Sequence, residues 1–167
     1  MEGGETHGSV ALWRSAISGD GELGLRILAD TNIFIKFTHR QPLAPAVEEA
    51  LDDSRTERFI SPVTVLEVFR LWKCGRLQDN PDTWVGNALM SWTVLPVTVA
   101  IARQSVLWNW EHRDPADRLL AATAQVDKVE LWHTDTVLKK LRGFPGRYFQ
   151  NVEAKGENSE NERQAKR

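Results

Sequence analysis

Carboxylate side chains stand at five positions where they could take part in metal chemistry. Carboxylate oxygens without a matching set of His or Cys side chains favour Mg²⁺ or Mn²⁺. Several carboxylates at one place repel each other and raise each other's pKa, a conflict that a divalent cation resolves. The sequence therefore suggests a divalent-metal site, provided that the fold brings the five residues together. They are Asp30 in "LADTN", Glu67 in "VTVLEVFRLW", Asp114 and Asp117 in "HRDPADRLLAATA", and Asp135 in "HTDTV".

Three of these acids also have a purely structural explanation as helix caps. Asp30 and Asp135 each follow a short apolar segment, and aspartate is among the best N-capping residues. Asp114 precedes Pro115, which is a common way to start a helix, and the chain twice repeats a capping residue followed by proline at earlier positions. This repetition favours a cap at Asp114, whereas both explanations stay open for Asp30 and Asp135.

Glu67 and Asp117 are less well explained by capping. Asp117 would be the third residue of a helix, where an acid favours the helix dipole, but it lies at the edge of the apolar face. Glu67 lies past the first turn of an almost continuously apolar helix. An exposed ion pair with Arg70 would contribute about a few tenths of a kcal/mol, while an unpaired buried carboxylate is costly. We therefore prefer Glu67 and Asp117 as ligands.

Short apolar segments alternate with helical patterns through most of the chain, and a further helix begins after Asp30. Strands separated by helices predict an α/β fold, with three α/β/α layers around a central, mostly parallel sheet. Binding sites in such sheets form beyond the carboxyl ends of the strands, where Asp30 and Asp135 stand. The predicted strands span 25–29, 58–60, 93–98 and 129–134, and the predicted helices 43–53, 61–77, 80–92, 99–112, 114–127 and 135–143.

Length and composition favour a single cytoplasmic domain. Of 167 residues, we assign 25–152 to this domain, 1–24 to a Gly-rich arm with a possible short helix over 10–17, and 153–167 to a polar tail that we expect to be disordered. No secretory signal is recognisable, no apolar run reaches the roughly 20 residues that span a bilayer, and the single Cys74 fits a reducing compartment. Because the net charge is −2, binding of nucleic acid would need local cations or metal ions.

Several common classes of active site are absent from the sequence. It contains no GxSxG, GxxxxGK[ST], GxGxxG or CxxC motif. A phosphate-handling fold of the haloacid dehalogenase kind would need a second aspartate two residues after Asp30, but Asn32 stands there. The four histidines share no metal-ligand spacing, so we interpret them as structural or surface groups: His7, His39, His112 and His133.

Four segments in order, "ILADTNIFIKF", "ISPVTVLEVFRL", "HRDPADRLLAATA" and "LWHTD", resemble the PIN-domain nucleases. More closely, they are similar to the VapC toxins of bacterial and archaeal toxin–antitoxin pairs, over about residues 25–152. Ala116 departs from the pattern, since many VapC-like chains carry Phe there. The resemblance implies catalytic, metal-binding roles for Asp30, Glu67, Asp117 and Asp135, and accessory roles for Asp114, Asn32 and Thr134.

The resemblance also implies an activity and partners. The activity is an Mg²⁺- or Mn²⁺-dependent endoribonuclease that cuts RNA of the tRNA or rRNA class and leaves a 5′-phosphate and a 3′-hydroxyl. The partners are a cognate antitoxin, whose arginine reaches the carboxylates, and a second copy of the chain, with no membrane. The alternatives are a housekeeping RNA-processing PIN nuclease and a non-catalytic PIN-like scaffold that binds RNA or protein.

Candidate contact residues follow from this reading. Apolar helix faces around Phe69, Trp72 and Trp84 are candidates for the antitoxin or dimer contact, or simply for the core. Cations near the motifs are candidates for contacts with the RNA backbone, although most could be solvated surface groups: Lys36, Arg40, Arg113, Arg118, Lys139, Lys140 and Arg142.

Overall fold

The computed structural model describes residues 24–153, which form an α/β fold around one parallel sheet. All four strand pairs are parallel, in the order β3-β2-β1-β4-β5, which confirms the predicted fold class. The assignments of the arm, its short helix and the tail lie outside the described residues, and the domain boundaries stay predictions. The strands are β1 (Arg26–Ala29), β2 (Glu57–Ile60), β3 (Thr93–Val94), β4 (Glu130–His133) and β5 (Gly146–Tyr148).

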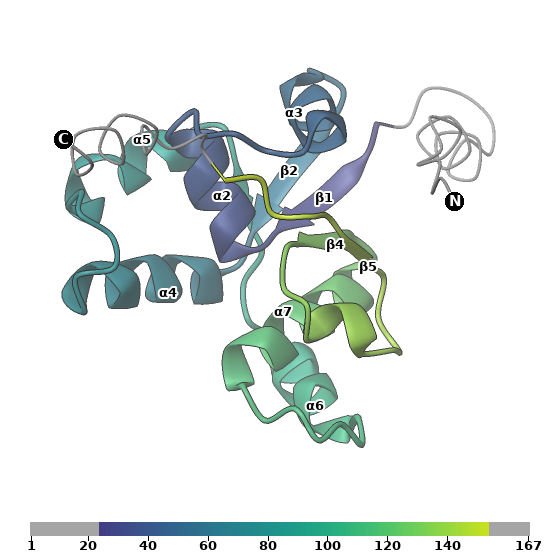
Figure 1. The fold of residues 1–167 in the computed structure, drawn as a ribbon. Helices are drawn as coiled ribbons and strands as arrows, with labels where there is room; N and C mark the ends of the chain where they lie inside the picture. The colour runs from purple at the N-terminus through teal and green to yellow at the C-terminus, as the bar shows by residue number, and fades with distance from the viewer. Residues whose placement is uncertain (1–23, 154–167) are drawn as a thin grey trace, which may run out of the picture.

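Helices cover both faces of this sheet (Figure 1). Helices α2 to α5 contribute to one hydrophobic cluster, and α7 contributes to the cluster on the opposite face, with α6 packed against α7. None of the described helices is long and apolar enough to cross a membrane. The helices are α2 (Thr31–Thr38), α3 (Pro45–Asp52), α4 (Pro62–Lys73), α5 (Val85–Leu89), α6 (Val99–Leu107) and α7 (Pro115–Asp127), with the 3₁₀ turns η1 (Pro81–Thr83) and η2 (Leu138–Lys140).

The central strands are buried on both faces, as expected of a parallel sheet between helix layers. In β1, Ile27 and Ala29 belong to the cluster beneath α2 to α5, while Leu28 belongs to the cluster beneath α7. In β4, Trp132 and Leu131 divide between the two clusters in the same way. Because successive side chains of a strand point to opposite faces, these two strands connect the layers that carry the acidic residues.

The helices predicted over 80–92 and 99–112 are wrong in their extent. The segment 80–92 starts as expected, with the Asn80 carboxamide accepting a hydrogen bond from the Asp82 N–H, but it divides into η1 and α5. The division falls at Trp84, whose backbone is not helical (φ −132°) and whose ring packs against Phe34 and His39. The helix predicted over 99–112 ends at Leu107 instead, because the chain then becomes extended.

The sheet edges also differ from the prediction. The strand predicted over 93–98 shortens to Thr93–Val94, and it lies at the edge of the sheet, as Pro96 led us to expect. The helix predicted over 135–143 is only the 3₁₀ turn η2. Strand β5 was not predicted, because its three residues follow a Gly-Phe-Pro segment and show no alternation.

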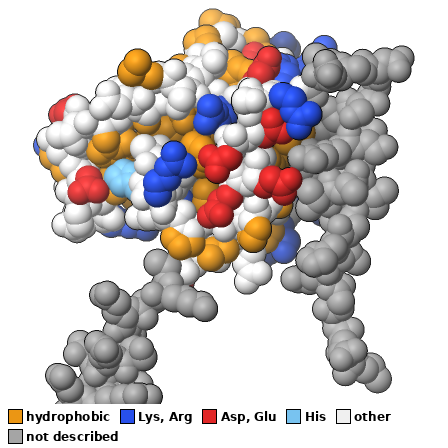
Figure 2. Space-filling view, turned by 90° about the horizontal axis from the view of Figure 1, so that it is seen from above, with side chains coloured by type: hydrophobic (Ala, Val, Ile, Leu, Met, Phe, Trp, Pro, Cys, Tyr) orange, Lys and Arg blue, Asp and Glu red, His pale blue; other side chains and the backbone are white. Residues whose placement is uncertain are grey.

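Acidic and basic side chains are mixed on the face of the molecule that carries α3. Seen from above, acidic side chains lie beside Lys and Arg side chains, with apolar side chains between them (Figure 2). This mixture agrees with the net charge of −2 and offers no broad basic surface for a phosphate backbone on this face.

Capping by Ser61 stabilises α4, the helix that carries Glu67. The buried Ser61 hydroxyl accepts a hydrogen bond from the Val63 N–H at 3.2 Å. Ser61→Ala is expected to lower the free energy of unfolding by about 1 kcal/mol, measured by urea denaturation, because this N–H loses its partner. Ser91→Ala, which removes an exposed hydroxyl, is the control and should change it by less than about 0.5 kcal/mol. Equal effects of both substitutions would contradict the capping argument.

Candidate active site

A cleft lies at the carboxyl edge of the sheet, and all seven residues predicted for the site line it: Asp30, Asn32, Glu67, Asp114, Asp117, Thr134 and Asp135. They come from the ends of β1 and β4 and from α2, α4 and α7. The parallel topology is the reason, since it places the carboxyl ends of neighbouring strands together. The other lining residues are Thr31, Ile35, Arg70, Leu71, Cys74, Arg76, Leu120, Leu138 and Asn151.

Asp30 is the most buried of the acids and is both a helix cap and a cleft residue. Its side chain accepts one hydrogen bond from the Ile33 N–H at 2.7 Å, which caps α2, and one from the Thr134 N–H at 2.9 Å. Burial raises the pKa of Asp30 to about 6; the Glu67 carboxylate also raises it, and the two N–H groups lower it. A nearby cation would stabilise the ionised form of this buried carboxyl group.

Asn32 and Thr134, the two residues predicted to be accessory, form a hydrogen-bonded chain to Asp30. The Asn32 carboxamide donates to the Thr134 hydroxyl at 2.8 Å, and this hydroxyl lies 3.4 Å from the same Asp30 oxygen that receives the Thr134 N–H. Both residues therefore fix the place where β4 ends relative to the start of α2.

Glu67 points to the same region from α4. Its carboxylate accepts a hydrogen bond from the Thr31 hydroxyl, the residue next to Asp30. Among the described residues Glu67 forms no ion pair, so the surface pair with Arg70 is not present. A polar contact at the cleft, rather than a surface salt bridge, explains this acid within an apolar helix.

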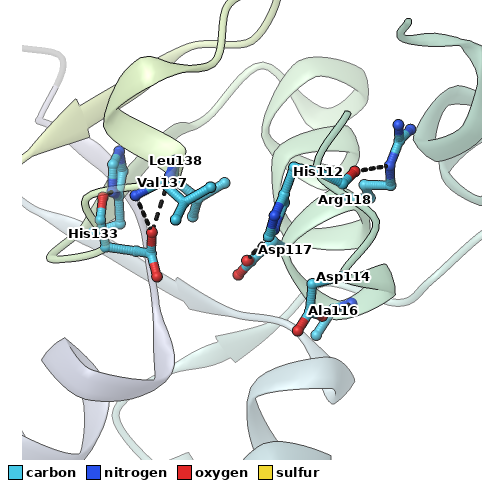
Figure 3. Close-up of polar contacts among 9 residues, drawn as sticks. His112, Asp114, Ala116, Asp117, Arg118, His133, Val137 and Leu138 are labelled. Carbon is cyan, nitrogen blue, oxygen red and sulfur yellow. Dashed lines mark hydrogen bonds and ion pairs between the residues drawn. The ribbon is translucent and has the colours of Figure 1, made fainter. Parts of the chain in front are cut away.

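Asp117 faces the cleft from the first turn of α7 and contacts a histidine. The His112 Nε2 lies 2.6 Å from the Asp117 carboxylate (Figure 3). Burial raises the pKa of Asp117, and the carboxylates of Asp114 and Asp135 also raise it, while the hydrogen bond with His112 lowers it. Sequence analysis missed His112; the only signal was its place five residues before Asp117.

Asp114 caps α7 and Asp135 accepts hydrogen bonds from the turn that follows it, while both residues line the cleft. The Asp114 carboxylate accepts from the Ala116 N–H at 2.8 Å, as the Asp-Pro pattern predicted. The Asp135 carboxylate accepts from the N–H groups of the turn that follows it, including that of Leu138 at 3.0 Å. Capping engages Oδ1 in each residue and leaves Oδ2 without a partner among the described residues.

The donors at this cleft suit an open Mg²⁺ or Mn²⁺ site better than a closed structural metal site. Within residues 24–153, no three His, Cys, Asp or Glu side chains are close enough to surround one ion. Mg²⁺ does not need such a cage, because it keeps several waters and is bound through one or two carboxylates together with phosphate oxygens. The oxygen-only donors and the raised pKa values of Asp30 and Asp117 agree with this kind of open site.

The candidate RNA-binding cations differ in whether their side chains already contact other groups of the protein. The Lys36 ammonium contacts Asn151 and the Val152 carbonyl, and Arg40 lies 3.7 Å from the Asp52 carboxylate. The Arg118 guanidinium donates to backbone carbonyls only. Two arginines that sequence analysis did not propose for RNA, Arg70 and Arg76, do line the cleft.

The raised pKa of Asp30 predicts a pH-dependent effect of Asp30→Asn on the metal-free protein. A carboxyl group with a folded pKa of about 6 against 3.8 unfolded contributes stability below pH 3.8 that is lost as the pH rises through 6. Asparagine is neutral throughout, so the variant should gain stability relative to wild type between pH 4 and 8, by about 3 kcal/mol at most. Urea denaturation in EDTA measures this difference.

Adding Mg²⁺ or Mn²⁺ at pH 8 should stabilise the wild type more than the variant, because a cation compensates the buried charge. A difference that stays constant from pH 4 to 8 would contradict the assigned burial effect.

Comparisons with known proteins agree with this geometry. The PIN domain family model matches residues 27–143, well over half of the chain. A chain in the crystal structure of VapBC2 from Rickettsia felis, bound to a promoter DNA fragment, is similar with a TM-score of 0.62 and 12% identity, over 75% of this chain and 100% of that one. A chain of DNA-bound VapBC from Salmonella typhimurium has a TM-score of 0.57 and 18% identity, over 74% and 98%. A comparison with curated proteins found no match. These structures share the fold, and the family match, which spans the acidic motifs, shows that the chain belongs to the PIN-domain family.

Proposed function

We propose that the chain is a metal-dependent endoribonuclease that acts in the cytoplasm as the toxin of a toxin–antitoxin pair. The observation that carries this proposal is the cleft at the carboxyl edge of the sheet, which Asp30, Glu67, Asp117 and Asp135 all line. Membership of the PIN-domain family, which contains nucleases, supports hydrolysis of a nucleic acid, and the similarity to chains of two VapBC complexes supports the toxin role.

The four acids would hold Mg²⁺ or Mn²⁺ together with water. When bound, the ion supplies positive charge that activates water and offsets the charge of the phosphate. Asp30 is held by two backbone N–H groups, so its orientation is fixed before substrate arrives. His112 holds Asp117 in a similar way. Hydrolysis would leave a 5′-phosphate and a 3′-hydroxyl on RNA of the tRNA or rRNA class.

Arg70 and Arg76 are the cations best placed to bind the RNA backbone. Both line the acidic cleft near the end of α4, and neither side chain has a hydrogen bond or ion pair with another described residue. Gly75, in a left-handed conformation (φ +75°), ends the helix and places Arg76 beyond it. Arginine side chains suit phosphate because the guanidinium can donate two parallel hydrogen bonds.

The proposed antitoxin would cover the same cleft, where an arginine could pair with the carboxylates. Exposed apolar side chains such as Leu66 on α4, with 61% exposure, could contact this partner or a second copy of the chain. Phe69 and Trp72 are half-buried, while Trp84 packs against the hydrophobic cluster beneath α2 to α5. Of the three aromatic candidates, Phe69 and Trp72 therefore stay available for the antitoxin and the homodimer.

Asp117→Asn is expected to abolish cleavage of total cellular RNA in Mg²⁺ or Mn²⁺, because the amide has lost the charge that binds the ion. EDTA should abolish cleavage by the wild type as well. Gel analysis of the RNA gives the cleavage pattern, and thermal unfolding confirms that the variant is folded. Full activity of the variant would mean that the site is misassigned.

Asp114→Asn is the matched control, since Asn caps a helix about as well as Asp and this acid is exposed. It should keep most of the activity. If the wild type neither binds Mn²⁺ nor cuts RNA, the chain is a PIN-like scaffold. Growth arrest on expression, relieved by the protein encoded beside it, separates a toxin from a housekeeping nuclease.

Arg70→Ala combined with Arg76→Ala is expected to raise KM for RNA and to lower the salt dependence of log KM. The loss of each phosphate contact should reduce the magnitude of the slope against log salt concentration by about 1. Arg103→Ala is the control, because this exposed arginine lies on α6 and does not line the cleft. Equal slopes for the wild type and the double variant would exclude the two arginines from phosphate binding.

A further inference from the structure

The segment between α6 and α7 has no regular structure, yet the Arg118 side chain fixes its backbone. The Arg118 guanidinium donates to the carbonyls of Ser105 at 2.7 Å, Trp110 at 3.0 Å and His112 at 2.8 Å, and also to that of Trp108 at 3.2 Å. Arginine has five N–H donors in a rigid plane, so one side chain can hold several carbonyls. Arg118 directly follows Asp117, so one turn of α7 supplies both the site acid and the group that fixes this segment.

Two tryptophans within the same segment also hold it in place. The rings of Trp108 and Trp110 stack with centroids 4.3 Å apart and planes at 4°. The Trp110 indole N–H donates to the Arg142 carbonyl at 3.1 Å. At Gly143, a Cβ atom would lie only 2.7 Å from the Trp108 indole nitrogen, so only glycine fits against the stacked pair.

This anchored segment places the His112 ring on the Asp117 carboxylate. Figure 3 shows the ring beside Asp117 while the His112 carbonyl receives the Arg118 guanidinium. His112 thus makes two contacts with consecutive residues of α7, one through its side chain and one through its backbone. The bond between the His112 carbonyl and Arg118 fixes the backbone from which the His112 ring reaches Asp117.

We propose that His112 is a positioning residue that orients the Asp117 carboxylate for a divalent cation, with Arg118 as its anchor. The proposal rests on the metal site of the proposed function. An ionised carboxylate has about four lone-pair directions, so a hydrogen bond from the imidazole leaves others free for an ion. Partners that hydrogen-bond to ligating carboxylates fix their orientation, and their loss weakens metal binding by about 10- to 100-fold.

Two amide variants test this role, and only the length of the side chain differs between them. The contact comes from Nε2, the far nitrogen of the ring, a position that the amide of Gln can reach and that of Asn cannot. His112→Gln is expected to bind Mn²⁺ within about threefold of the wild type, whereas His112→Asn should bind it about 10- to 100-fold more weakly. Isothermal titration with Mn²⁺, without RNA, measures the affinities.

His39→Gln is the matched control, because His39 also lies near a carboxylate, 3.5 Å from Asp79, but does not line the cleft. It should leave the Mn²⁺ affinity unchanged. Thermal unfolding of each variant in EDTA separates weakened binding from loss of the fold. Wild-type affinity in a folded His112→Asn variant, or equal losses in the Asn and Gln variants, would overturn the role of His112. A wild type that does not bind Mn²⁺ would instead contradict the metal site itself.

Discussion

The hydrogen bonds to the Asp30 carboxylate are the interaction on which the site depends. One comes from the start of α2 and the other from the residue that follows β4, so this side chain joins two elements more than 100 residues apart. Capping and a place in the cleft are therefore not alternatives at Asp30. The same N–H groups that satisfy the buried carboxylate also aim it into the cleft, and they leave part of the charge uncompensated, as the raised pKa shows.

The sequence predicted which residues gather at one cleft better than it predicted the bounds of the elements around it. Apolar strands that end in acids, and helices that open with a cap and a proline, are local signals, and they place Asp30, Glu67 and Asp117 correctly at one cleft. The break at Trp84 depends on ring packing against Phe34, a distant residue. Such contacts leave no trace in periodicity, so the helix predicted over 80–92 was too long.

Charge is visible in a sequence, but the availability of a charge is not. Arg118 stands beside a site acid, and its position suggested contact with RNA, yet its donors are used by backbone carbonyls. Arg70 was considered only as a partner for Glu67, although the structure leaves it at the cleft without that ion pair. His112 was interpreted as a structural or surface group because the histidines share no metal-ligand spacing. A residue that orients an acidic ligand, however, does not need such a spacing.

The two sides of the cleft belong to different layers of the protein. Asp117 lies on α7, which packs on one face of the sheet, while Thr31 and Glu67 belong to α2 and α4, which pack together on the other. An ion bound by residues of both sides would connect the two cores at the cleft, in addition to the strands and the contact between α4 and α7. Its binding would then slow amide hydrogen exchange on both faces of the sheet at once.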